Sequence, residues 1–115
     1  PKMEATIHAA LLSKMNERGQ IKGCIVDGPF ALDNAVSKEA AEHKGIMSPV
    51  AGDADILLMP DIEAGNIFYK SMIFLAGGKV ASAIIGAKCP VALTSRADTD
   101  ETKLLSLALT CLMAK

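Results

Sequence analysis

Ser95 and Arg96 stand side by side at the end of a short apolar run, and together they could hold an anion. An arginine guanidinium offers phosphate a rigid fork of N–H donors, and the N-terminus of a following helix adds backbone donors. The alternative is a solvated arginine that pairs with the carboxylates of Asp98 and Asp100, while the serine hydroxyl satisfies a turn. These two carboxylates could instead act as general bases or cap the helix.

A second polar group comprises Asp61, Glu63, Asn66 and Lys70. Asn66 and Lys70 are four residues apart, so they share one face of a helix if the segment is helical. Such a face could border a ligand. It could equally be the capped, solvent-facing start of a helix, and the residues alone leave both alternatives open.

Asp27 and Asp33 lie in another polar loop, which begins Asp27-Gly28-Pro29. Either carboxylate could face a ligand, but Asp33 is also well placed to cap a helix. His8 and His43 are expected on helix surfaces, and their positions offer no paired metal ligands. We therefore expect no metal site.

The polar loops are predicted to connect strands with helices. Short apolar runs predict strands over residues 21–26, 54–59 and 91–94, whereas 80–85 suits a helix or a strand. Helical spacing and end signals predict a helix over 3–18, a second from the cap Asp33 to Gly45, and a third from the cap Asp61 to Gly77. A last helix is predicted from Asp98 to the C-terminus, where Asp98 and Glu101 have the spacing of a capping box. This alternation predicts a single α/β unit over residues 1–115: a layered, mainly parallel sheet with helices on both faces. Parallel strands would gather the polar loops at one sheet edge, where such folds bind ligands.

Composition excludes several classes of function. The chain has 115 residues, of which 50% are apolar and 22% are charged, and its formal net charge is −1. Nucleic-acid or anionic-membrane binding would need clustered positive charge, and no apolar run is long enough for a membrane span. Cys24, Cys89 and Cys111 lack any metal or redox spacing, so they are expected to be buried, reduced thiols of a cytoplasmic protein.

Three separated segments resemble the phosphate acetyl/butyryltransferase family, and in particular the C-terminal part of a phosphate butyryltransferase. They read VDGPFALDNA over residues 26–35, PDIEAGN over 60–66 followed by Tyr69-Lys70, and PVALTSRAD over 90–98. The segments come in the family's order, and the resemblance covers nearly all of the chain from Ile21 onward.

The resemblance implies reversible transfer of a short acyl group between CoA and inorganic phosphate, within short-chain acyl-CoA metabolism. The acyl group would be butyryl, with acetyl or branched groups as alternatives. Arg96 would bind phosphate or the developing negative charge, and Ser95 would assist at the thioester. The family's acid–base carboxylate follows this pair by a few residues, and among Asp98, Asp100 and Glu101 we choose Asp100. The substrate-binding candidates are Asp27, Asp33, Asp61, Asn66 and Lys70.

The resemblance also implies a two-domain α/β subunit with the isocitrate/isopropylmalate dehydrogenase fold, assembled as a homodimer or larger. Acyl-CoA and phosphate would be substrates, with no tightly bound cofactor. Family members are longer, so a missing N-terminal domain is expected to supply further basic residues, and this chain alone need not be active. The alternative is a non-catalytic ligand-binding or assembly module, and an exposed apolar face would mark a removed domain. A dehydrogenase-like nucleotide binder is less favoured, because no glycine fingerprint follows the first strand.

Overall fold

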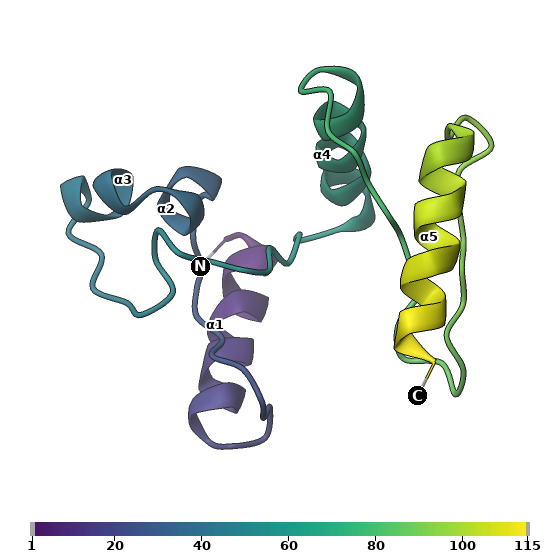
Figure 1. Cartoon of the computed structure of the whole chain (residues 1–115). Helices are drawn as coiled ribbons and strands as arrows, with labels where there is room; N and C mark the ends of the chain where they lie inside the picture. The colour runs from purple at the N-terminus through teal and green to yellow at the C-terminus, as the bar shows by residue number, and fades with distance from the viewer. Residues whose placement is uncertain (1, 115) are drawn as a thin grey trace. The chain divides into compact units, whose positions relative to one another are not determined.

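The computed structural model describes residues 2–114 and divides the chain into two compact units, Pro1–Pro60 and Asp61–Lys115. The first unit holds α1 (Glu4–Glu17), α2 (Leu32–Val36) and α3 (Lys38–His43). The second unit holds α4 (Ile62–Phe74) and α5 (Asp100–Met113), as Figure 1 shows. The Ser-Arg pair lies just before α5, so the second unit positions it.

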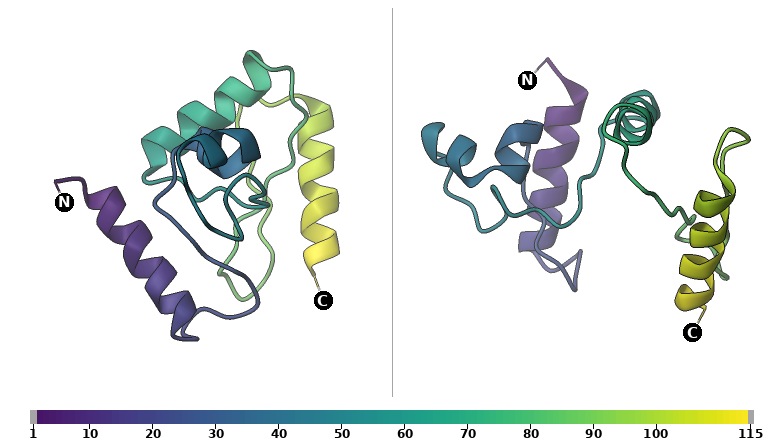
Figure 2. Two further views of the ribbon diagram at one scale, coloured as in Figure 1. Left: turned by 90° about the vertical axis from the view of Figure 1, so that its left-hand side faces the viewer. Right: turned by 45° about the horizontal axis from the view of Figure 1, so that its top comes forward.

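In the first unit, Asn16 holds the extended run that follows α1. Its side-chain Nδ2 donates to the Ile21 carbonyl at 3.0 Å, and its Oδ1 accepts the Val26 N–H at 3.0 Å. The Ser13 hydroxyl lies 3.4 Å from the Gly28 carbonyl, so the chain turns back along α1 (Figure 2). The Asn16 side chain thereby satisfies backbone groups at both ends of this run, which has no sheet ladder among residues 2–114.

Ser37 separates the two short helices α2 and α3. Its backbone is extended, and its hydroxyl accepts the Ala40 N–H at 3.2 Å, which caps α3. The loop after α3 returns to α2, where the Gly52 N–H donates to the Asn34 carbonyl at 2.8 Å. A Cβ at Gly52 would lie 2.5 Å from the Lys38 Cα, and the Gly52 φ is +76°, so this close approach requires glycine.

In the second unit, the extended chain between α4 and α5 runs beside α5 (Figures 1 and 2). Ile84 and Val91 form an isolated antiparallel bridge across this segment. Ser106 of α5 is fully buried and accepts the Ser82 N–H at 3.0 Å, while the Ser82 hydroxyl donates to the Leu93 carbonyl at 2.9 Å. Ser106 therefore binds the Ser82 arm of this segment to α5 directly, and Ser82 in turn binds the arm that leads to Ser95.

Three predicted helices are confirmed, because their apolar spacing and end signals are local. They are the helix over residues 3–18, which is α1, the helix capped by Asp61, which is α4, and the C-terminal helix, which is α5. The helix predicted from Asp33 to Gly45 is instead two helices, because Ser37 is extended.

Two predicted helix caps are wrong. Asp33 lies inside α2, whose N-cap is Ala31 with no side-chain hydrogen bond. Asp98 precedes the true N-cap of α5, which is Thr99, and the Thr99 hydroxyl accepts the Thr102 N–H at 3.2 Å. Asp98 instead accepts the Ser95 N–H, which lies outside α5. Asp33 accepts the Asn34 N–H and a hydrogen bond from Lys44 from a position within α2, so it is not the N-cap.

The apolar runs at 21–26, 54–59 and 91–94 are not in β-ladders within the described part of the chain. Residues 80–85 are not helical, and their one pairing is the bridge at Ile84. The mainly parallel sheet and the single α/β unit both stay predictions, since a ladder needs a neighbouring strand as well as a suitable run.

Few side chains are buried in either unit. Among residues 2–114 the buried ones are Asn34, Ala35, Ala41 and Ser106. Large apolar side chains are exposed instead, including Ile56, Leu58, Ile62, Leu75, Ile85 and Leu112.

All three cysteines are free thiols but exposed, so their predicted burial is wrong. Within residues 2–114 few side chains of either unit are buried, so an apolar stretch does not by itself bury its cysteine. In residues 2–114 no helix combines the length and apolar character needed to cross a membrane.

Candidate functional site

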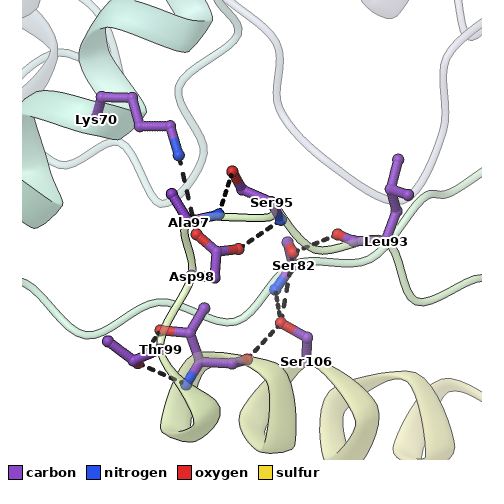
Figure 3. A network of polar contacts seen from close by, with 9 residues as sticks. Lys70, Ser82, Leu93, Ser95, Ala97, Asp98, Thr99 and Ser106 are labelled. Atoms are coloured by element: carbon purple, nitrogen blue, oxygen red, sulfur yellow. Dashed lines mark hydrogen bonds and ion pairs between the residues drawn. The ribbon is translucent and has the colours of Figure 1, made fainter.

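The Ser-Arg pair forms the first half of a closed four-residue turn over residues 95–98. The Asp98 N–H donates to the Ser95 carbonyl at 3.1 Å. The Ser95 N–H donates to Asp98 Oδ2 at 2.7 Å, as Figure 3 shows. The Ser95 hydroxyl also accepts the Ala97 N–H at 3.4 Å. Asp98 therefore bonds both backbone groups of Ser95, which fixes the turn.

Arg96 occupies the second position of this turn and is exposed. Within residues 2–114 its guanidinium has no ion pair. The two carboxylates that could have paired with it are engaged elsewhere: Asp98 with Ser95 and Lys70, and Asp100 with Lys103 at 3.4 Å. The arrangement favours an arginine that faces an external anion over one that is neutralised by its neighbours.

Lys70 extends from α4 toward Asp98. Its Nζ lies 3.8 Å from Asp98 Oδ1, and it is buried without a hydrogen-bond partner among the described residues (Figure 3). The rings of Tyr69 and Phe74 have their centroids 5.0 Å and 5.9 Å from this ammonium. The Asp98 side chain is only 3% exposed, so the pair is largely shielded from solvent. Burial, with the Asp98 charge as the second cause, raises the pKa of Tyr69.

The other predicted residues of this unit have simpler surroundings. Asp61 caps α4, with its Oδ1 accepting the Ala64 N–H at 2.7 Å. Asn66 is exposed on α4, one helical turn before Lys70. Asp100, the chosen acid–base residue, is the first residue of α5 and is fully exposed. The structure thus brings together Ser95, Lys70 and the carboxylate of Asp98.

Two substrate-binding candidates belong to the first unit. Asp27 is exposed, and its Oδ1 accepts the Gly28 N–H at 2.8 Å. Asp33 is also exposed and accepts a hydrogen bond from Lys44 Nζ at 2.7 Å, which holds the pKa of its carboxyl below the ordinary value. Within the part of the chain that is described, no three His, Cys, Asp or Glu side chains group where a metal ion could bind.

Sequence reasoning missed that Asp98 closes the turn and that Ser106 fastens the segment before it. A signal for the first was present, because Ser95 and Asp98 have the i, i+3 spacing of a turn whose ends bond each other. The pairing of Lys70 with Asp98 joins residues far apart in the sequence and has no local signal.

Known proteins resemble this chain closely. The sequence matches the family described as Phosphate acetyl/butaryl transferase over residues 1–111. A phosphate acetyltransferase from Thermotoga maritima is 68% identical over 99% of this chain and 39% of its own length. A phosphate butyryltransferase from Clostridium acetobutylicum is 57% identical over 99% of this chain and 38% of its own length.

A solved structure is also similar. The crystal structure of a branched-chain phosphotransacylase from Enterococcus faecalis has a TM-score of 0.85 and 41% identity, covering 96% of this chain and 41% of that one. The chain thus spans well under half the length of these relatives and corresponds to their C-terminal part. By its sequence and its backbone, the chain belongs to the phosphate acetyl/butyryltransferase family.

Proposed function

We propose that this chain supplies the phosphate-binding part of an enzyme that transfers a short acyl group reversibly between CoA and inorganic phosphate. The observation that carries the proposal is the exposed Arg96, held in a closed turn with no ion pair among residues 2–114. Membership of the acyltransferase family supports the reaction. Butyryl is the proposed acyl group, with acetyl and branched groups as the alternatives, because relatives carry all three kinds of name.

The reaction brings anions together, and this is the step that Arg96 is proposed to assist. A phosphate oxygen attacks the thioester carbonyl, a C–O bond forms, and the carbonyl electrons pass to oxygen. The C–S bond then breaks and CoA leaves as a thiolate. Arg96 would offset the negative charge of phosphate and of the tetrahedral oxyanion, and the Ser95 hydroxyl would donate to the thioester oxygen. No bond to the protein is needed.

Asp100 is proposed as the acid–base residue near the CoA sulfur. In the acyl-CoA-forming direction it would take the proton of the CoA thiol, and in the other direction it would return it. Its exposure at the start of α5 leaves it open to a large substrate. Asn66 and Lys70 of α4, with Asp27, Asp33 and Asp61, remain the proposed substrate-binding residues, although Asp33 and Asp61 also have structural hydrogen bonds.

The same proposal extends to the whole enzyme. We propose a cytoplasmic homodimer or larger assembly, whose N-terminal domain adds further basic residues, with a mainly parallel sheet and helices on both faces. Exposed apolar side chains such as Ile56 and Leu75 support the larger assembly, because a monomer rarely exposes many such side chains. The non-helical runs at 21–26, 54–59 and 91–94 are compatible with strands.

Release of CoA thiol tests the proposal directly. The chain is given butyryl-CoA or acetyl-CoA, with and without inorganic phosphate, and compared with Arg96→Ala and with Arg18→Ala, an exposed arginine just after α1. We expect phosphate-dependent release, about 100-fold slower in Arg96→Ala and unchanged in Arg18→Ala. The ratio of the two rates gives the acyl preference.

A non-catalytic module is the second candidate, favoured by the apolar side chains that are exposed. That alternative would be supported if the folded chain binds phosphate but releases no thiol. The longer protein, which adds the remaining part found in the relatives, would then also have to release none. Phosphate-dependent release that is equal in Arg96→Ala and in the unchanged chain would contradict the role of Arg96.

A further inference from the structure

We propose that Lys70 and Asp98 are a positioning pair that holds the Ser95–Arg96 turn in shape and keeps the Asp98 carboxylate away from Arg96. The inference rests on the proposed function, since it explains how Arg96 stays available to a substrate anion. It replaces the direct substrate contact proposed for Lys70 above with a role that acts through Asp98.

The two carboxylate oxygens of Asp98 have separate partners. Oδ2 accepts the Ser95 N–H at 2.7 Å, and Oδ1 faces the Lys70 ammonium at 3.8 Å (Figure 3). The Asp98 side chain is nearly fully buried, so few other groups compete for it. The hydrogen bond fixes the backbone on which Arg96 stands, and the ammonium supplies the countercharge that a buried carboxylate needs.

Arg96 would otherwise be the natural partner of this carboxylate. The two residues are two positions apart in one turn, and a guanidinium binds a carboxylate more strongly than a single N–H does. If Lys70 lost its charge, Asp98 could turn to Arg96, which would open the turn and neutralise the anion site at once. Lys70 prevents both effects because its ammonium pairs with Asp98 Oδ1, the oxygen that does not bond Ser95.

The surroundings of Lys70 suit such a role. Its ammonium is buried without a hydrogen bond among the described residues, and the Asp98 carboxylate is the one negative group paired with it there. The rings of Tyr69 and Phe74 lie next to it. Weak solvent screening strengthens the attraction between Lys70 and Asp98 relative to a surface pair.

A double-mutant cycle on the 115-residue chain tests the positioning role. Lys70→Met removes the charge with similar length, and Asp98→Asn keeps an acceptor for the Ser95 N–H but no charge to offer Arg96. Lys79→Met is the matched control, because Lys79 is an exposed lysine of the same unit, paired with Glu101 at 2.6 Å. Circular dichroism verifies that each variant is folded.

We expect Lys70→Met to raise the KM for phosphate about tenfold and Lys79→Met to leave it unchanged. The double variant Lys70→Met with Asp98→Asn should bring the KM for phosphate back close to that of the unchanged chain. The uncharged amide that replaces the Asp98 carboxylate cannot neutralise Arg96. If the double variant is as impaired as Lys70→Met, or more so, Lys70 acts on the substrate itself and the inference is overturned.

Hydrogen exchange of the Ser95 amide provides a readout that needs no activity. We expect this amide to exchange slowly in the unchanged chain and about tenfold faster in Asp98→Ala and Lys70→Met. Equal exchange in all three chains would overturn the inference whatever the activity. If the unchanged chain and its longer form transfer no acyl group, the proposed function fails, and the exchange rates then decide the positioning role alone.

Discussion

The hydroxyl of Ser106 accepts the backbone N–H of Ser82 at 3.0 Å and donates to the Thr102 carbonyl at 2.7 Å. Ser106 is 0% exposed, so its hydroxyl depends on protein groups for its hydrogen bonds. Because Ser82 in turn donates to the Leu93 carbonyl, one side chain of α5 fixes both arms of the segment that leads to the Ser-Arg turn.

Replacing Ser106 with alanine should therefore destabilise the second unit. The partly buried Ser82 N–H would lose its partner, which costs about 1 kcal/mol of unfolding free energy. Urea unfolding followed by circular dichroism measures the loss. Thr110→Val is the control, because the Thr110 hydroxyl bonds only the Ser106 carbonyl of its own helix at 2.7 Å. Equal losses in both variants would show that the bond to Ser82 contributes nothing.

Two variants of Asp61 distinguish a capping role from a substrate-binding role for this residue. Its Oδ1 accepts the Ala64 N–H at 2.7 Å, so Asp61→Ala should destabilise α4 by about 1 kcal/mol. Asp61→Asn keeps the acceptor and should retain nearly all of that stability. Thermal unfolding and thiol release are measured on both variants. A rise in the KM for substrate in the stable Asp61→Asn chain would identify a binding role beyond the cap.

The pair of Asp33 and Lys44 should respond to acid. The hydrogen bond from Lys44 is the main cause that lowers the pKa of Asp33 below its ordinary value of 3.8. The folded chain therefore binds this proton less tightly than the unfolded chain does. The stabilisation of the folded chain by this pair is complete above pH 3.8, and it is lost as the pH falls through the lowered pKa of Asp33. Carbon-detected NMR titration of the Asp33 carboxyl measures that pKa, and Lys44→Met should raise it toward 3.8.

The cysteines should react without unfolding. Cys24, Cys89 and Cys111 are all exposed, so a maleimide reagent should modify three thiols per native chain. Mass spectrometry counts the adducts, and the chain in denaturant serves as the reference. Protection of any of the three in the longer, assembled enzyme would locate a surface that its other parts cover. Protection in this chain alone would contradict the exposure of the three thiols.

The helices could be predicted from the sequence because their signals are local. The apolar spacing of α1, the Asp61 cap of α4 and the leucine-rich face of α5 each involve residues within a few turns of one another. The two wrong caps arise where neighbouring polar residues compete. Thr99 and Asp98 could both cap α5, and the choice depends on the bond of Asp98 to Ser95 and its pairing with Lys70.

The sheet and the assembled site depend on contacts between distant residues. A run such as 91–94 can be apolar and extended, but the sequence does not show which segment pairs with it. The Ser-Arg pair was identifiable from its types and its place before a helix. Its turn geometry, with Lys70 behind Asp98, was not, because Lys70 lies on a different helix.

The closed turn over residues 95–98 has a thermodynamic consequence for ligand capture. Its backbone torsions are restricted within the chain itself, by the hydrogen bonds of the Asp98 N–H and of the Asp98 carboxylate. The conformational entropy of ordering this backbone is therefore lost during folding, and an arriving anion has to immobilise only the side chain of Arg96. The same arginine on a mobile loop would bind the anion more weakly through identical contacts.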